Sequence, residues 1–169
     1  MVRGRFKQFV RALPLVVAAL TPAMTDTPAN ASTATGSVPI SATVLAQCDV
    51  SATSLSFGNY SSAQLDASAI VSVTCATGTP YTVALDTGSG SGATVPNRAM
   101  TGPSSAVLNY SLYRDTGRSQ VWGQTVGTDT LAGTGTGSLT ALTVYGRIPA
   151  GQHPAPGAYT DTVSVTLAY

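Results

Sequence analysis

Apolar and polar residues alternate at period two in the last part of the chain, from Ala158 to Tyr169. This pattern is typical of a strand with one face buried and the other in solvent. The apolar positions are Val163, Val165, Leu167 and Tyr169. The strand is expected to end the chain, and the one charge that it carries is Asp161. Because an uncovered edge beside an apolar face is a liability in a soluble protein, we expect another molecule to supply the missing neighbour.

The same alternation, interrupted by turn residues, predicts a series of short strands. They are expected at residues 38–48, 53–57, 69–75, 80–86, 107–114, 119–122, 139–147 and 158–169. Two Gly-rich stretches, residues 88–92 and 133–137, are expected to be flexible surface connections. No stretch has a convincing period of about 3.6 residues, which a helix would show. The pattern therefore predicts an all-β fold, an antiparallel sandwich of immunoglobulin-like type.

The amino-terminal residues have the composition of an export signal. Residues 1–11 carry four basic side chains and no acid, and a short apolar run follows at residues 12–20. That run is too short to cross about 30 Å of hydrocarbon. Residues 29–31 satisfy the small-x-small cleavage rule, so we expect a signal peptide over residues 1–31 and a mature chain from Ser32, with nearby alanines as alternative cleavage positions. The sequence thus predicts an exported protein without direct membrane insertion.

Composition beyond residue 31 excludes several classes of partner. The remaining charged side chains are four arginines and six aspartates, with no lysine or glutamate. Such a weakly acidic surface attracts neither nucleic acid nor an anionic membrane. Serine and threonine are abundant while strong helix formers are scarce, which favours strands. The length is that of one domain with enough chain to bury a core.

Few residues carry chemistry. Cys48 and Cys75 are the two cysteines, and an even pair in an exported chain favours a disulfide over free thiols. A zinc site lacks ligands, because His153 is the single histidine. His153 lies in a Pro-rich turn without a nucleophile motif, and the scattered aspartates give no carboxylate pair. Residues 88–93 match a dinucleotide motif only loosely, because no helix can follow them. We predict no catalytic residue, no metal site and no cofactor.

Aromatic residues at strand positions suggest an alternative function. A sugar-binding platform would draw on Tyr110, Tyr113, Trp122 and Tyr145, with Arg114 or Arg147 adding polar contacts. Aromatic residues at alternating strand positions are, however, more often core residues or cross-strand partners. A monomeric, secreted carbohydrate-binding sandwich is therefore the alternative to an assembling subunit.

The stretch from Gly36 to Ala46 also alternates at period two. Its apolar positions are Val38, Ile40, Ala42, Val44 and Ala46. A strand of this kind either pairs with the sheet edge of a neighbouring molecule or forms the first strand of its own sandwich. Period-two alternation does not show which sheet the strand joins. A division is a third interpretation, in which Val38 and Ile40 serve the neighbour while Val44 and Ala46 begin the chain's own first strand.

A series of short motifs runs in a fixed order along residues 38–169. The motifs are Leu55-x-Phe57-Gly58-x-Tyr60, Val71-x-Val73-x-Cys75, Tyr81-x-Val83, Asn109-Tyr110-x-Leu112-Tyr113-Arg114-Asp115, Trp122-Gly123, Tyr145-Gly146-Arg147-Ile148-Pro149-Ala150-Gly151-Gln152 and Gly157-x-Tyr159-x-Asp161-x-Val163. Together they resemble the spore coat protein U domain family, to which pilin subunits of the archaic, Csu-type chaperone-usher pathway belong. Each motif alone is weak, but their joint order is specific and covers nearly all of this range.

The resemblance implies an incomplete immunoglobulin-like sandwich that a donor strand from another subunit completes. Its expected partners are a periplasmic chaperone, an outer-membrane usher, and identical or related pilin subunits. Its expected location is a surface fibre reached through the periplasm. The expected function is therefore a structural subunit of a pilus that supports adhesion or biofilm formation, and a spore-coat or matrix protein that needs no usher is a further alternative.

The expected domain organisation follows from this resemblance. Residues 32–47 would form the donor extension and the start of the first strand, and residues 48–169 the sandwich domain. The expected donor residues are Val38, Ile40, Ala42 and Val44. The expected acceptor groove is lined by Val163, Val165, Leu167 and Tyr169, which would otherwise be ordinary core residues covered by the start of the same chain.

Overall fold

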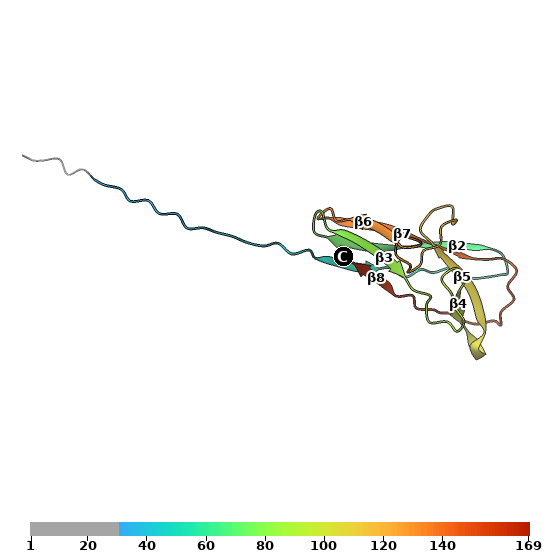
Figure 1. The fold of residues 1–169 in the computed structure, drawn as a ribbon. Helices are drawn as coiled ribbons and strands as arrows, with labels where there is room; N and C mark the ends of the chain where they lie inside the picture. Colours follow the sequence, from blue (N-terminus) through green and yellow to red (C-terminus); the bar gives the residue numbers. More distant parts are fainter. Residues whose placement is uncertain (1–30) are drawn as a thin grey trace, which may run out of the picture. The chain divides into compact units, whose positions relative to one another are not determined.

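The computed structural model describes residues 31–169 (Figure 1). The chain divides into two units, and the second, Ala42–Tyr169, contains the folded domain. The expected signal peptide, residues 1–31, lies outside the described residues except for its last position. Within the described part of the chain, no helix has the length and hydropathy of a membrane span.

Two antiparallel sheets form the domain. In chain order the strands are β1 (Cys48–Ala52), β2 (Leu65–Cys75), β3 (Pro80–Leu85), β4 (Arg98–Thr101), β5 (Val107–Tyr113), β6 (Leu131–Thr134), β7 (Leu139–Ile148) and β8 (Val165–Ala168). One sheet has the order β1-β2-β7-β5-β4 and the other the order β6-β3-β8. A short 3-10 turn, Pro103–Ser105, connects β4 to β5. The all-β sandwich expected from the sequence is confirmed.

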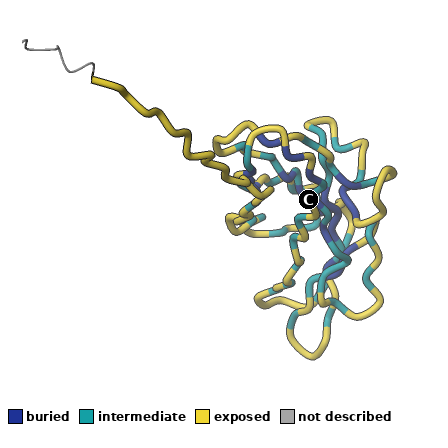
Figure 2. The backbone as a smooth tube through the Cα atoms, turned by 60° about the vertical axis from the view of Figure 1, so that its left-hand side comes forward, coloured by how far each residue is buried: buried dark blue, intermediate teal, exposed yellow. Residues whose placement is uncertain are grey.

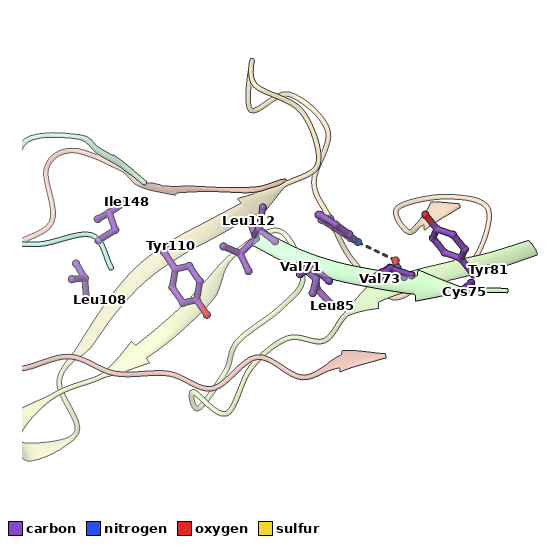
Figure 3. Packing of buried hydrophobic residues seen from close by; sticks show 12 residues of the cluster. Val71, Val73, Cys75, Tyr81, Leu85, Leu108, Tyr110, Leu112 and Ile148 are labelled. Atoms are coloured by element: carbon purple, nitrogen blue, oxygen red, sulfur yellow. Dashed lines mark hydrogen bonds between the residues drawn. The ribbon is translucent and has the colours of Figure 1, made fainter. Parts of the chain in front are cut away.

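The core lies between the two sheets, where the strands present alternate residues (Figures 2 and 3). Its strand residues include Val71, Val73, Tyr81, Val83, Leu85, Leu108, Tyr110, Leu112, Val144 and Ile148. Each aliphatic side chain that is fully buried stabilises the fold by about 1.5–3 kcal/mol. Trp122, from the loop after β5, is also fully buried, and its indole N–H donates to the Val83 carbonyl at 3.0 Å. Tryptophan thereby fills the core without an unpaired polar group.

Several expected strand ranges are wrong. Residues 38–47, 53–57 and 119–122 contain no strand, apart from an isolated bridge between Val121 and Tyr113. Only Val165–Ala168 of the expected strand 158–169 forms a ladder. Period-two alternation indicates a buried face, but a ladder also needs a neighbouring strand. Residues 53–57 contribute apolar side chains to the interior without such a neighbour.

Two observed strands were not predicted, and β1 was predicted only at Cys48. β6 includes Gly133 and overlaps the start of the stretch expected to be a flexible connection. β4 begins at Arg98, whose charge breaks the apolar pattern, yet this side chain is 0 % exposed. Its guanidinium donates hydrogen bonds of 2.8–3.1 Å to four backbone carbonyls, those of Leu85, Asp86, Val95 and Trp122. A buried cation is tolerated when its donors are satisfied in this way, although burial lowers the pKa of the guanidinium.

The expected disulfide between Cys48 and Cys75 is present. The two residues lie directly opposite each other in the register of β1 and β2, with their Cα atoms 4.1 Å apart. The bond fastens the edge strand β1 to the inner strand β2. Closing a loop of this length stabilises the fold by about 3–4 kcal/mol in the chain-entropy model.

Candidate functional site

An open groove lies between two uncovered edges of the sandwich. β1 is an edge of the five-stranded sheet, β8 is an edge of the three-stranded sheet, and the two strands lie close to each other (Figure 1). The groove continues between two segments that lie outside the ladders except at one end: the first wall, residues 52–60, which begins at the last residue of β1, and the second wall, residues 155–165, which ends at the first residue of β8. In sequence, the first wall lies near the start of the folded domain and the second wall near its end.

Two adjoining hollows make up the groove, with volumes of about 400 and 740 Å³. The smaller hollow has an apolar floor that includes Val71 from one sheet and Leu85 from the other. The larger hollow lies beside residues 153–159 and has a more polar lining. Both hollows share Leu55, Phe57, Met100 and Tyr159. A long groove with apolar pockets fits an extended chain segment that inserts alternate side chains.

Backbone groups along the groove are available for pairing. The amide of Asp86, after β3, donates to the Ser164 carbonyl at 3.1 Å, so the backbone of Ser164 faces β3. Alternation along an antiparallel strand then directs the backbone groups of Val163, Val165 and Leu167 to the opposite, open edge. Within residues 31–169 no strand pairs with that edge. An added strand would find a row of hydrogen-bonding groups as well as apolar pockets.

The expected acceptor residues occupy different parts of this edge. Val163 and Val165 line the smaller hollow and pack against the core. Leu167 packs against the core on β8 but lies outside both hollows. Tyr169 is 61 % exposed and also lies outside them. The structure therefore places two of the four residues in the groove lining.

The first wall was not identified from the sequence as part of the groove. Leu55 and Phe57 point into the interior and contact β7 at Gly146, where an added Cβ would lie 2.7 Å from the Phe57 ring. The Phe57 ring also meets Tyr110 edge-on, with the ring centroids 6.0 Å apart. The available signal is the alternation of Leu55 and Phe57, which predicts a strand over residues 53–57.

A polar cluster interrupts the apolar floor of the groove at Asp161. One carboxylate oxygen of Asp161 accepts a hydrogen bond of 2.6 Å from the Tyr110 hydroxyl. The other accepts from the backbone and hydroxyl of Ser89, at 2.7 and 2.8 Å, and from the Thr162 amide at 2.7 Å. Burial raises the pKa of Asp161, but these bonds outweigh it and the net pKa is lowered. Burial and the bond to Asp161 raise the pKa of Tyr110, so the phenol stays protonated.

A second carboxylate holds the same wall nearer β8. One oxygen of Asp86 accepts hydrogen bonds of 2.9 Å from the amides of Gly88 and Ser164. Burial raises the pKa of Asp86, whereas these two bonds lower it and prevail. The second wall is therefore fixed to the connection after β3 by two ionised aspartates.

The expected donor residues are exposed in the structure. Val38 is 83 %, Ile40 92 % and Val44 90 % exposed, and Ala42 is exposed as well (Figure 2). These large apolar side chains are in solvent and are available for burial against another surface.

The aromatic residues considered for sugar binding do not form one platform. Tyr110 and Trp122 are buried in the core. Tyr113 and Tyr145 lie opposite each other in the register of β5 and β7, and the Arg118 guanidinium covers the Tyr145 ring at 5.6 Å. The two polar candidates are engaged elsewhere: Arg147 binds Asp66 through two hydrogen bonds, and Arg114 donates to the carbonyls of Thr128 and Thr130.

His153 lies at the rim of the larger hollow. Its Nδ1 atom is 3.2 Å from the Ser62 hydroxyl, which also donates to the Gln152 carbonyl at 2.9 Å. Within residues 31–169, His153 makes no hydrogen bond to a carboxylate. In the part of the chain that the structure describes, no group of three His, Cys, Asp or Glu side chains is placed to hold a metal ion.

Comparison with known proteins gives three results. The Spore Coat Protein U domain matches residues 34–166. Protein U of Myxococcus xanthus is 33 % identical over 180 residues, covering 95 % of this chain and 100 % of that protein. Among solved structures, the fold is similar to a chain in the CsuC–CsuE chaperone–tip adhesion subunit pre-assembly complex from archaic chaperone-usher Csu pili of Acinetobacter baumannii, with a TM-score of 0.58 and 22 % identity. That match covers 75 % of this chain and 41 % of the other, so this chain spans less than half of its length.

Proposed function

Because this chain belongs to the Spore Coat Protein U domain family, we propose that it is a structural subunit of a surface fibre and that its open groove accepts an extended strand from a neighbouring subunit. The observation that carries this proposal is the groove itself. Apolar pockets lie along its floor, and unpaired backbone edges lie beside them. Strand addition uses both features, since ladder hydrogen bonds supply affinity and side-chain pockets supply specificity.

The donor in this proposal is the extension at residues 32–47, and the acceptor is the domain at residues 48–169. Val38, Ile40, Ala42 and Val44 would enter the groove of the next subunit. Burying each large aliphatic side chain contributes about 1.5–3 kcal/mol, and the added strand also completes the ladder on β8. Assembly would then need neither a nucleotide nor a cofactor, which fits a structural protein rather than an enzyme.

The proposed partners follow from the same groove. A subunit with an uncovered apolar groove needs protection before assembly, since exposed edges and apolar patches promote aggregation. The solved complex with a similar fold pairs a chaperone with a pilus subunit. For this chain we infer export by residues 1–31, protection by a periplasmic chaperone, passage through an outer-membrane usher, and a final place in a fibre of related subunits that serves adhesion or biofilm formation.

The similarity to Protein U supports a second candidate, a coat or matrix protein that uses the same groove without an usher. The two candidates differ in their assembly requirements. Deleting the chaperone and usher genes would leave coat incorporation intact but abolish a fibre.

Size analysis of three oxidised proteins tests the proposal. The first is the mature chain, residues 32–169; the second lacks residues 32–43; the third carries that segment behind Tyr169 on a flexible linker. We expect polymer from the first, unstable or chaperone-dependent protein from the second, and a stable monomer from the third. Stable monomers from the first two would contradict strand exchange and would favour the sugar-binding sandwich.

A further inference from the structure

The second wall has few hydrogen bonds to the two sheets along the part that runs from its contact with β4 to the start of β8. Thr160 pairs with Thr101 of β4 through two backbone hydrogen bonds of 2.9 and 3.1 Å. Ser164 is held by Asp86 at the start of β8. Between these two points the wall is fastened through the side chain of Asp161. Apart from the packing of Val163 on the core, the wall over the smaller hollow is therefore held in position by that carboxylate.

Asp161 connects three parts of the fold at this point. Tyr110 belongs to β5 in the five-stranded sheet, and its hydroxyl reaches across the interior to the wall that leads into the three-stranded sheet. Figure 3 shows this hydroxyl directed toward the segment before β8. Ser89 approaches from the connection after β3. The approach is close, since an added Cβ at Gly88 would lie 2.2 Å from the Asp161 carboxylate, and Gly88 has a φ of +82°. The Tyr110–Asp161 contact is thus a strut beneath the groove.

We propose that Asp161, supported by Tyr110, is a positioning residue for strand uptake: it holds the second wall where an incoming strand can pair with it. The inference rests on the proposed strand exchange and adds the residues that prepare the acceptor. Holding a binding edge in its bound conformation lowers the ordering cost at the moment of binding. Loss of the strut therefore slows uptake more than its effect on folding stability explains.

Two single substitutions in the mature chain, residues 32–169, test this role. Tyr110→Phe removes only the hydroxyl, and Asp161→Asn removes the charge while keeping an oxygen acceptor. Asp115→Asn is the matched control, because Asp115 also accepts hydrogen bonds from loop residues, Ser119 and Gln120, but lies in the turn after β5. Polymerisation is followed by light scattering. Hydrogen exchange of the Ser89 and Thr162 amides, which bind Asp161, reports the wall directly.

We expect the two groove variants, Tyr110→Phe and Asp161→Asn, to polymerise about tenfold more slowly than the wild type. This factor corresponds to the loss of one hydrogen bond to a charged group. Their Ser89 and Thr162 amides should exchange faster, while Asp115→Asn should polymerise at the wild-type rate. Wild-type rates in both groove variants would overturn the inference. So would an equal slowing in all three variants that follows their melting temperatures, since that result indicates stability alone.

The same experiment separates this inference from the proposed function. If the wild-type mature chain does not polymerise, the strand-exchange proposal fails. Faster exchange of the Ser89 and Thr162 amides in Tyr110→Phe would then still establish the strut, without a role in uptake. If the wild type polymerises and Tyr110→Phe and Asp161→Asn polymerise at the same rate as the wild type, the proposed function stands and the positioning role is wrong.

Discussion

The middle of the first wall, at Leu55 and Phe57, is held by apolar packing, whereas the second wall combines the packing of Val163 and Val165 with hydrogen bonds to ionised carboxylates. Leu55 and Phe57 of the first wall pack on Gly146 and Tyr110, and β1 before them is fastened by the disulfide. Asp161 in the second wall and Asp86 beside it accept bonds from backbone and hydroxyl donors. Apolar packing is insensitive to pH, but carboxylate bonds are lost in acid. The two walls should therefore respond to different perturbations.

The largest effect should come from a substitution in the donor segment. This change leaves both walls intact and tests the incoming strand alone. Ile40→Asp would place a charge in an apolar pocket, and an unpaired buried charge is strongly unfavourable. We expect polymerisation of the mature chain to be abolished, while the domain still accepts a wild-type donor and folds when a chaperone is present. Size analysis of the variant alone and mixed with wild-type chain measures this. Normal polymer from the variant alone would contradict the assignment of Ile40.

The second-largest effect should come from breaking the disulfide, which fastens β1, the strand that leads into the first wall. Cys75→Ser removes the bond that holds β1 to β2, and we expect a loss of about 3–4 kcal/mol in unfolding free energy. Denaturant unfolding of the oxidised wild type and the variant gives the difference. The reduced wild type is the control and should resemble the variant. Equal stability of oxidised and reduced protein would show that the disulfide does not support this wall.

Packing of the first wall is tested by truncating Phe57. Phe57→Ala should cost about 2–3 kcal/mol, at or below the lower end of the range for a buried phenylalanine, because this residue is only partly buried. Phe57→Leu is the matched control and should retain most of the stability, since it keeps an apolar side chain of similar reach. The loss should be the same at pH 7 and pH 4. A loss that changes strongly with pH would remove the distinction between the walls.

Acid should weaken the second wall selectively, and the loss of unfolding free energy should be the smallest of the predicted effects. The folded-state pKa of Asp161 is lowered, so its stabilisation is present above the unfolded pKa of about 3.9 and is lost as the pH falls through the folded value. The titratable groups that act on it are Tyr110 from β5, which donates to it, and Arg98 from β4, which interacts with it electrostatically. Asp161→Asn should cost about 1–2 kcal/mol at pH 7.

The measurement is the difference in unfolding free energy between wild type and Asp161→Asn across pH. It should shrink toward zero in acid, and using the difference removes the contributions of Asp66, Asp86 and Asp115, whose pKa values are also lowered. A constant difference down to pH 2 would show that the Asp161 charge does not hold the second wall.

The sandwich could be predicted from the sequence because its strands carry their burial pattern locally. Val71 and Val73 are separated by Ser72, and Val83 and Leu85 by the small Ala84, and this short-range alternation does not depend on the partner strand. β4 was missed for the opposite reason. Arg98 is buried because four carbonyls from other segments satisfy it, and an isolated arginine in a sequence does not reveal such a cage.

The lining of the hollows follows the sequence pattern only in part, for the same physical reason. Val163 and Val165 follow the alternation and line the smaller hollow. Asp161 was interpreted as a charge on a strand edge, because its partners Tyr110 and Ser89 lie 51 and 72 residues away. The hydrogen bonds that position a wall join distant segments, so they become visible only when the chain is folded.

The position of the disulfide has a mechanical consequence for a fibre. If tension is applied through the segment before Cys48, the load reaches Cys75 directly through the covalent bond. Cys75 ends β2, an inner strand with β1 on one side and β7 on the other. The edge strand therefore cannot be unzipped one hydrogen bond at a time, and the pull is shared by the ladders of an inner strand. In an oxidised subunit the load passes into the inner strand β2, whereas in a reduced one the single ladder of β1 would bear it.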